Sequence, residues 1–133
     1  MIDIETSVFS PIATTLRTEY PGVSVTGEYV REPSKFPHVS IVESDNYVST
    51  NRRDTASRER YSTVMYEVNV YSDLQSGKKA ECRKILNTID EMMYGMNFTR
   101  IAMTPVPNMQ NSSVYRLTAR YRAETDGTNL YRF

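Results

Sequence analysis

Side chains able to carry out chemistry are scarce in this sequence. His38 is the single histidine and Cys82 the single cysteine, so a histidine-based triad or a multi-histidine metal site has almost no material. Cys82 falls on the apolar stripe of a predicted helix, where a cysteine serves as a small hydrophobe. The sequence has no glycine-rich phosphate loop, no CxxC pair and no calcium-binding loop. We therefore predict that the protein is not an enzyme and binds no cofactor.

Two pairs of carboxylates come closest to a metal site. Asp90 and Glu91 fall on the polar side of a predicted helix and are expected to be solvated. Glu43 and Asp45 stand two residues apart in a predicted strand, so they are expected to share one face of it. Two carboxylates on one face could bind a cation, but a solvated pair is the commoner outcome. We predict no metal site.

The charged residues are balanced in number but not in position. Sixteen Lys and Arg residues cancel sixteen Asp and Glu residues, so the whole chain has no field that would attract nucleic acid or a membrane. Residues 1–50 carry three basic and seven acidic residues, net −4, whereas residues 98–133 carry five basic and two acidic residues, net +3. This asymmetry is either ordinary surface charge or a sign of head-to-tail contact between copies of the chain.

Two groups of arginines are candidate interaction residues on the basic side. Arg116, Arg120 and Arg122 lie on one face of a predicted strand. This basic row is a solvent-facing sheet edge, a subunit contact or a phosphate contact. Four more lie in a polar stretch at about 49–60, which we predict to be an extended hairpin tip: Arg52, Arg53, Arg58 and Arg60. Long loops in a compact domain are more often functional than short ones.

The complementary candidates are acidic residues on or beside strands of the N-terminal half. They are Glu28, Glu32, Glu43 and Asp45. The C-terminal tail at 126–133 adds the apolar side chains of Tyr131 and Phe133. Because free termini are usually loose, these side chains indicate docking, either on this domain or on a partner.

Apolar periodicity predicts one α+β domain at residues 1–125. Period-two alternation is typical of strands with one buried face, and spacing of three and four residues is typical of an amphipathic helix. A long strand is predicted at 61–72, in which Val64 and Val68 share a face, and it is followed by an amphipathic helix at 78–94. The clearest alternating strand is 114–124. The predicted elements, in order, are a helix at 4–20, strands at 23–30, 38–48 and 61–72, a helix at 78–94, and strands at 98–107 and 114–124.

This order, α-β-β-β-α-β-β, fits a mainly antiparallel sheet of about five strands with both helices on one face. Pro11 leaves two possibilities for the first helix: a long helix that kinks at the proline, which we favour, or a short helix that begins there. Apolar runs stay well below the ~20 residues of a membrane span, and the N-terminus does not read as a signal peptide. We expect a protein that is made and used in a cytoplasm.

Four segments occur in an order and spacing that resemble a known family. They are Phe-Pro-His-Val-Ser-Ile-Val-Glu at 36–43, Tyr-Glu-Val-Asn-Val-Tyr-Ser at 66–72, Gly-Lys-Lys-Ala-Glu at 77–81 and Tyr-Arg-Leu-Thr-Ala-Arg-Tyr at 115–121. On these segments the chain resembles the small tail-terminator, or tail-completion, proteins of bacteriophages with long non-contractile tails. The resemblance covers residues 4–125, and its segments are structural in character.

The resemblance implies a structural virion protein. Such proteins form a ring, commonly a hexamer, at the head-proximal end of the tail tube, where the ring stops tube polymerisation and offers a surface to the head connector. The implied partners are further copies of the chain, the tail tube protein and the head connector or stopper protein. Genomic DNA would only pass through the lumen, and assembly would take place in the host cytoplasm. The family marks no catalytic residues.

Three alternatives remain open. Other phage neck proteins, namely stoppers and head–tail adaptors, look similar at this level. A small nucleic-acid-binding module would use Arg116, Arg120, Arg122 and the arginines of residues 49–60, and its affinity would fall steeply with salt. A small enzyme is disfavoured because sets of acid, base and nucleophile are missing.

Overall fold

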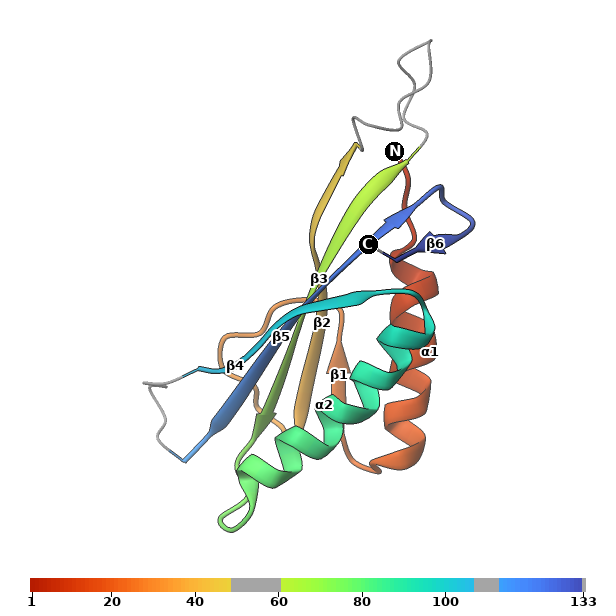
Figure 1. Cartoon of the computed structure of the whole chain (residues 1–133). Coiled ribbons are helices and arrows are strands. Elements are labelled where there is room, and N and C mark those ends of the chain that lie inside the picture. The colour runs from red at the N-terminus through yellow and green to blue at the C-terminus, as the bar shows by residue number, and fades with distance from the viewer. Residues whose placement is uncertain (49–60, 107–112, 133) are drawn as a thin grey trace, which may run out of the picture.

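The computed structural model describes residues 1–48, 61–106 and 113–132. The helices are α1 at Glu5–Glu19 and α2 at Lys78–Gly95. The strands are β1 at Ser24–Thr26, β2 at His38–Val48, β3 at Ser62–Ser72, β4 at Thr99–Pro105, β5 at Tyr115–Thr125 and β6 at Leu130–Tyr131 (Figure 1). The predicted order of helices and strands is confirmed, and the C-terminal tail adds β6.

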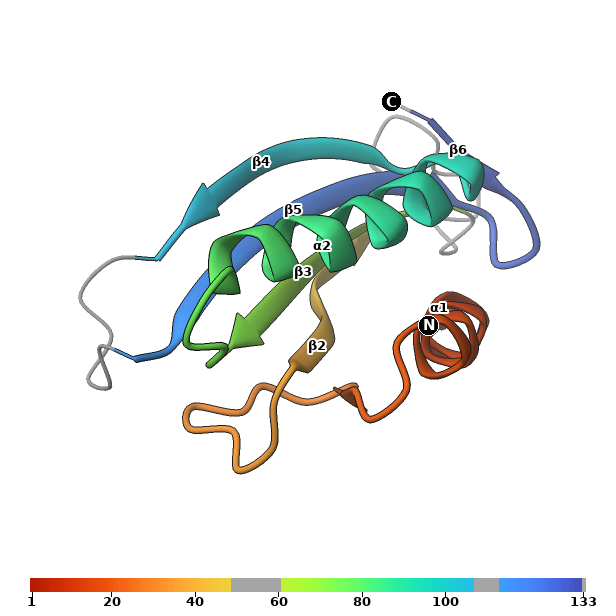
Figure 2. The same cartoon turned by 90° about the horizontal axis from the view of Figure 1, so that it is seen from below.

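The strands form one mixed sheet in the order β1-β2-β3-β5-β4, with β6 paired to β5. All pairings are antiparallel except that of β1 with β2. Both helices lie on the same face of the sheet (Figure 2), so the predicted α+β arrangement is confirmed. β1 is parallel to β2 because residues 27–37 carry the chain back from the end of β1 to the level of its start, where Ser24 is in register with His38.

Apolar side chains of both helices and of the helix-facing side of the sheet form a single core. In β3, the predicted inward set is completely buried: Val64, Tyr66, Val68 and Val70. The helices contribute Val8, Ile12, Ala13 and Leu16 from α1, and Cys82, Ile85, Leu86, Ile89 and Met93 from α2. α1 continues through Pro11, which confirms the longer of the two possible first helices.

Part of β3 is buried on its other side as well. Asn69 and Tyr71 point away from the helices, as the alternation predicts, yet both are fully buried. The connection at residues 27–37 covers this part of the sheet, and the Tyr71 hydroxyl donates a hydrogen bond to the Val30 carbonyl oxygen at 3.2 Å. One end of the sheet is therefore covered on both faces.

A β-bulge in β2 overturns the expectation that Glu43 and Asp45 share a face. Glu43 is in register with Tyr66, which points into the core, whereas Asp45 is in register with Met65, which points away from it. The extra residue is Ser44, whose hydroxyl donates to the Met65 carbonyl oxygen at 3.2 Å. Because one inserted residue inverts the alternation that follows it, the two carboxylates lie on opposite faces of the sheet.

Candidate functional site

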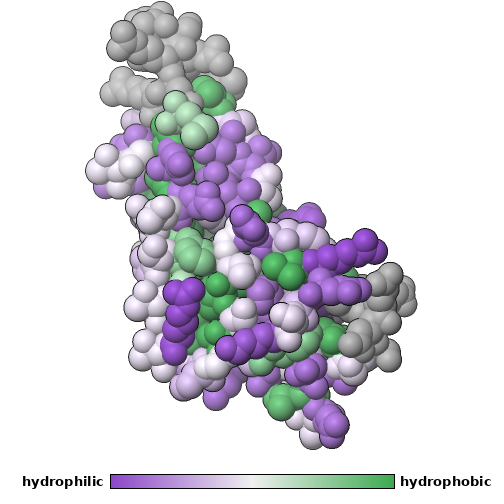
Figure 3. Space-filling view, turned by 180° about the vertical axis from the view of Figure 1, so that it is seen from behind, coloured by the Kyte–Doolittle hydropathy of each residue, from purple (hydrophilic) through white to green (hydrophobic). Residues whose placement is uncertain are grey.

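The face of the sheet that the helices leave uncovered carries the predicted row of arginines, and we call it the outer face. Figure 3 shows this side of the molecule, where polar side chains predominate and apolar ones are scattered. Arg116, Arg120 and Arg122 alternate along β5 with the buried residues Leu117 and Tyr121, which belong to the core. All three arginines therefore lie on the outer face, but their surroundings differ.

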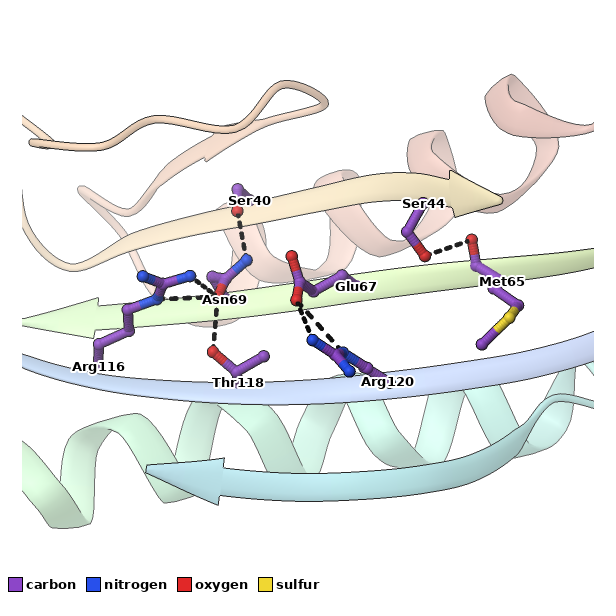
Figure 4. Close-up of polar contacts among 8 residues, drawn as sticks. All are labelled: Ser40, Ser44, Met65, Glu67, Asn69, Arg116, Thr118 and Arg120. Atoms are coloured by element: carbon purple, nitrogen blue, oxygen red, sulfur yellow. Dashed lines mark hydrogen bonds and ion pairs between the residues drawn. The ribbon is translucent and has the colours of Figure 1, made fainter. Parts of the chain in front are cut away.

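Arg116 is held within the domain by a polar network (Figure 4). Its Nε and Nη2 atoms donate to Asn69 Oδ1 at 3.0 and 2.8 Å, and the Thr118 hydroxyl donates to the same oxygen at 2.6 Å. Asn69 in turn donates through Nδ2 to the Ser40 hydroxyl oxygen at 3.4 Å. The network joins three neighbouring strands, so it is part of the fold.

Aromatic rings hold the same guanidinium from other directions. Arg116 Cζ lies 5.5 Å from the ring centroid of Tyr29 and 5.4 Å from that of Tyr71. Both distances are in the range of cation–π attraction. Arg116 is therefore bound within its own domain, which differs from all three alternatives predicted for this row.

Arg120 lies four residues further along β5 and is far more open. Its side chain is 61% exposed, and its Nε atom lies 3.4 Å from Glu67 Oε1 (Figure 4). An exposed ion pair of this kind contributes little to folding and is screened by salt. Arg122 is half-buried, in register with Met65 of β3 and Thr99 of β4. Arg120 is thus the arginine of this row that remains most available to a partner.

The acidic candidates are also unequal. Glu28, Glu32 and Asp45 are exposed, and Asp45 accepts the backbone N–H of Asn46 at 2.9 Å. Glu43 is half-buried on the helix-facing side, where its Oε1 accepts the Tyr66 hydroxyl at 3.3 Å. Burial raises the pKa of Glu43, and the nearby charges of Asp3 and Glu5 raise it further. Glu43 therefore lies on the helix-facing side of the sheet and not on the outer face.

His38 lies at the covered end of the outer face. It is 3% exposed, and its ring packs against Tyr71 with the ring centroids 5.8 Å apart. Burial lowers the pKa of His38, so the imidazole is neutral near pH 7. This position indicates a structural role.

The C-terminal tail docks on its own domain. β6 pairs with β5, and Asn97 Nδ2 donates to the Leu130 carbonyl oxygen at 2.8 Å. Arg132 hydrogen-bonds the Tyr94 carbonyl oxygen and lies 3.9 Å over the Tyr94 ring. Tyr131 remains 37% exposed and donates to Asp126. Residues 126–132 therefore dock on this domain, and a contact of Tyr131 with a partner stays a prediction.

Five of the predicted interaction residues fall outside the described ranges. They are Arg52, Arg53, Arg58, Arg60 and Phe133. The hairpin tip at about 49–60 thus stays a prediction.

Sequence reasoning missed a groove between α1 and the end of β1 with the two residues that follow it. It has a volume of about 380 Å³ and is lined by Glu5, Thr6, Phe9, Ser10, Thr26, Gly27 and Glu28. Its one signal in the sequence is Gly27, because a glycine within a strand pattern often marks a close approach of another group. Its acidic rim comes from Glu5 and Glu28, and its apolar wall from Phe9.

Within residues 1–48, 61–106 and 113–132, no group of three or more His, Cys, Asp or Glu side chains could hold a metal ion. None of the helices in the described part of the chain is long and apolar enough to cross a membrane. Comparison with protein-family models finds no match to this chain, and comparison with curated proteins finds none either.

Proposed function

We propose that this chain is a structural virion protein of the tail-terminator type. It forms a ring, most simply a hexamer, at the head-proximal end of a phage tail tube. There it stops tube polymerisation and joins the tail to the head connector. The proposal starts from the ordered segments that resemble this family, and the α+β fold with both helices on one face of the sheet agrees with it.

The observation that carries the proposal is the difference in charge between two edge regions of the sheet, one formed by β4 and β5 and the other by β1 and β2. On the β4–β5 side, the side chains of Arg100 and Arg120 remain 47% and 61% exposed. On the β1–β2 side, Glu28 and Asp45 are exposed. A closed ring requires two different and complementary patches on each subunit. Opposite charges on the two sides would select the partner and speed its encounter.

The state of the two potential catalytic side chains also favours a structural role. Burial raises the pKa of the Cys82 thiol to about 12, so thiolate, the reactive form, is negligible at neutral pH. His38 is buried against Tyr71 and away from solvent. Neither side chain is placed to meet a substrate.

A nucleic-acid-binding module is less well supported than a ring. Such a module would need the arginines of β5 to reach phosphates together. Arg116 is instead bound to Asn69 and flanked by two tyrosines. Only part of the predicted basic row is therefore open to a phosphate backbone.

Negative-stain electron microscopy of the purified protein, with and without tail tubes, tests the proposal. We expect rings of uniform diameter or caps on one end of each tube. Tubes that keep growing at both ends in excess protein, with no rings in either sample, would contradict it. A ring that binds the head connector but leaves tubes uncapped would instead identify a stopper or adaptor.

A further inference from the structure

We propose that the ring contact continues the sheet from one copy to the next, with β4 of one copy lying in the groove beside β1 of its neighbour. This inference rests on the proposed ring for the identity of the partner, a second copy of this chain. Its evidence is the geometry of the two outermost strands, the direction in which they run, and the chemistry of the groove.

β1 and β4 are the two ends of the strand order β1-β2-β3-β5-β4. Within the described residues, each has a strand on one side only. A strand edge with unpaired N–H and C=O groups is a template for another chain. The sheet therefore offers one edge on each side, as a head-to-tail contact requires.

The directions of the two edge strands suit each other. β1 runs parallel to β2, while β2–β3, β3–β5 and β5–β4 are successively antiparallel. β4 thus runs opposite to β1. If a neighbouring copy continues the sheet with its helices on the same face, β4 meets β1 of that copy in antiparallel orientation.

The backbone groups needed for such pairing point outward. The Ser24 N–H bonds the Pro37 carbonyl oxygen of the β2 side, so the alternation turns the polar backbone groups of Val25 to the free edge. On the other side, the Val106 N–H bonds the Arg116 carbonyl oxygen, which turns Met103 and Pro105 outward. Pro105 has no N–H group, and an edge strand tolerates a proline where the missing N–H would point to the free edge. β4 can accept a neighbour at Met103 without losing its pairing to β5.

Gly27 lines the groove beside β1 and leaves it wider than a large side chain would. A Cβ atom placed on it would lie 3.7 Å from Glu5 Oε1 and 3.7 Å from the Phe9 ring. Positive φ angles occur in Gly22, Gly77 and Gly127 but not in Gly27, so its backbone does not demand a glycine. At these distances a Cβ atom makes ordinary van der Waals contact, so a small side chain fits at this position, whereas a large one would occupy the space between α1 and β1.

The groove and β4 are chemically complementary. Glu5 and Glu28 supply negative charge around the apolar wall of Phe9. β4 carries Arg100, which is 47% exposed beside Asp90, and Ile101, which is 46% exposed at a β-bulge. A groove with two glutamates and one phenylalanine ring in its lining is suited to a cation next to an apolar side chain.

Disulfide trapping between two single variants tests the contact. Gly27→Cys and Ile101→Cys proteins are mixed with tail tubes under mild oxidation, and Gly27→Cys with Asn87→Cys, on the exposed side of α2, is the matched control. The native Cys82 is buried and stays out of the exchange. We expect a mixed disulfide dimer in the first mixture and only background in the second.

The outcomes separate this inference from the proposed function. Rings or caps without the Gly27–Ile101 cross-link would overturn the edge contact and leave the terminator function standing. The specific cross-link without rings or caps would keep the edge contact and overturn the terminator function. Absence of both would overturn both.

A second pair of variants tests the same contact without introduced cysteines. Gly27→Leu fills the groove and should weaken self-association about tenfold or more, with folding retained. Thr14→Leu places the same leucine side chain on the exposed side of α1 outside the groove and should associate as the wild type does. Equal association of the two variants in sedimentation velocity would contradict the proposed contact.

Discussion

Arg116 and Arg120 stand four residues apart on one face of one strand, yet they belong to different parts of the molecule. Arg116 donates to Asn69 and lies between two tyrosine rings, under the connection that covers one end of the sheet. Arg120 lies outside the part of the sheet that this connection covers, and it forms one exposed ion pair with Glu67. A row of like residues in a strand is therefore not one functional unit. Its covered end stabilises the fold, and its open end is available for contact.

The largest expected effect on the free energy of unfolding comes from a substitution in the core. It is the reference for the smaller effects expected from Arg116 and Arg120. Ile89 is fully buried in the cluster that includes Val68. We expect Ile89→Ala to lower the free energy of unfolding by about 2–5 kcal/mol, because it removes buried methyl groups and leaves a cavity. Urea denaturation followed by circular dichroism measures the loss. A loss below about 1 kcal/mol would mean that α2 packs through another face.

Arg116→Ala should come next, and it tests the covered end directly. The substitution removes two hydrogen bonds to a buried oxygen and two cation–π contacts, so we expect a loss of about 1–3 kcal/mol. Arg120→Ala is the matched variant and should cost less than about 0.5 kcal/mol, as exposed pairs do. Equal losses for the two variants would remove the distinction between the two ends.

A smaller, pH-dependent effect is expected from His38 at the covered end. Burial lowers its pKa below the ordinary value of 6.5, so below about pH 6.5 the unfolded chain binds more protons than the folded one. Stability should therefore fall as the pH drops through this range. Tyr71, the ring against His38, has a raised pKa and stays neutral there.

Urea denaturation between about pH 5.5 and 7.5 measures this effect, because a histidine titrates in that interval. His38→Gln should flatten the dependence. The same slope in this variant would show that another group is responsible. Glu43, whose raised pKa acts in the opposite direction from its ordinary value of 4.5 upward, is present in both proteins and does not affect the comparison between them.

Elements with a strong local pattern could be predicted from the sequence. The alternation of β3 and β5 identified their buried faces, and the spacing of Ile85, Ile89 and Met93 identified the packed side of α2. These patterns depend only on the period of a strand or a helix and on which residues avoid water. The placement of both helices on one face of the sheet followed from these apolar patterns.

Features that depend on distant parts of the chain could not be predicted. The bulge at Ser44 arises from pairing with Met65 and separates Glu43 from Asp45. The burial of Asn69 depends on Ser40, Thr118 and Arg116, which are far from it in sequence. The groove between α1 and β1 needs both elements in place, and Gly27 was its one local sign.

The most direct test of the account is tube capping by Arg120→Glu, scored by negative-stain microscopy beside the wild type. Arg83→Glu makes the same charge change on the exposed side of α2 and serves as the control. All three proteins should fold, since exposed charges contribute little to stability. We predict that the wild type and Arg83→Glu cap tube ends and that Arg120→Glu does not. Capping by Arg120→Glu equal to that of the wild type, at low and at high salt, would contradict the role of this face in assembly.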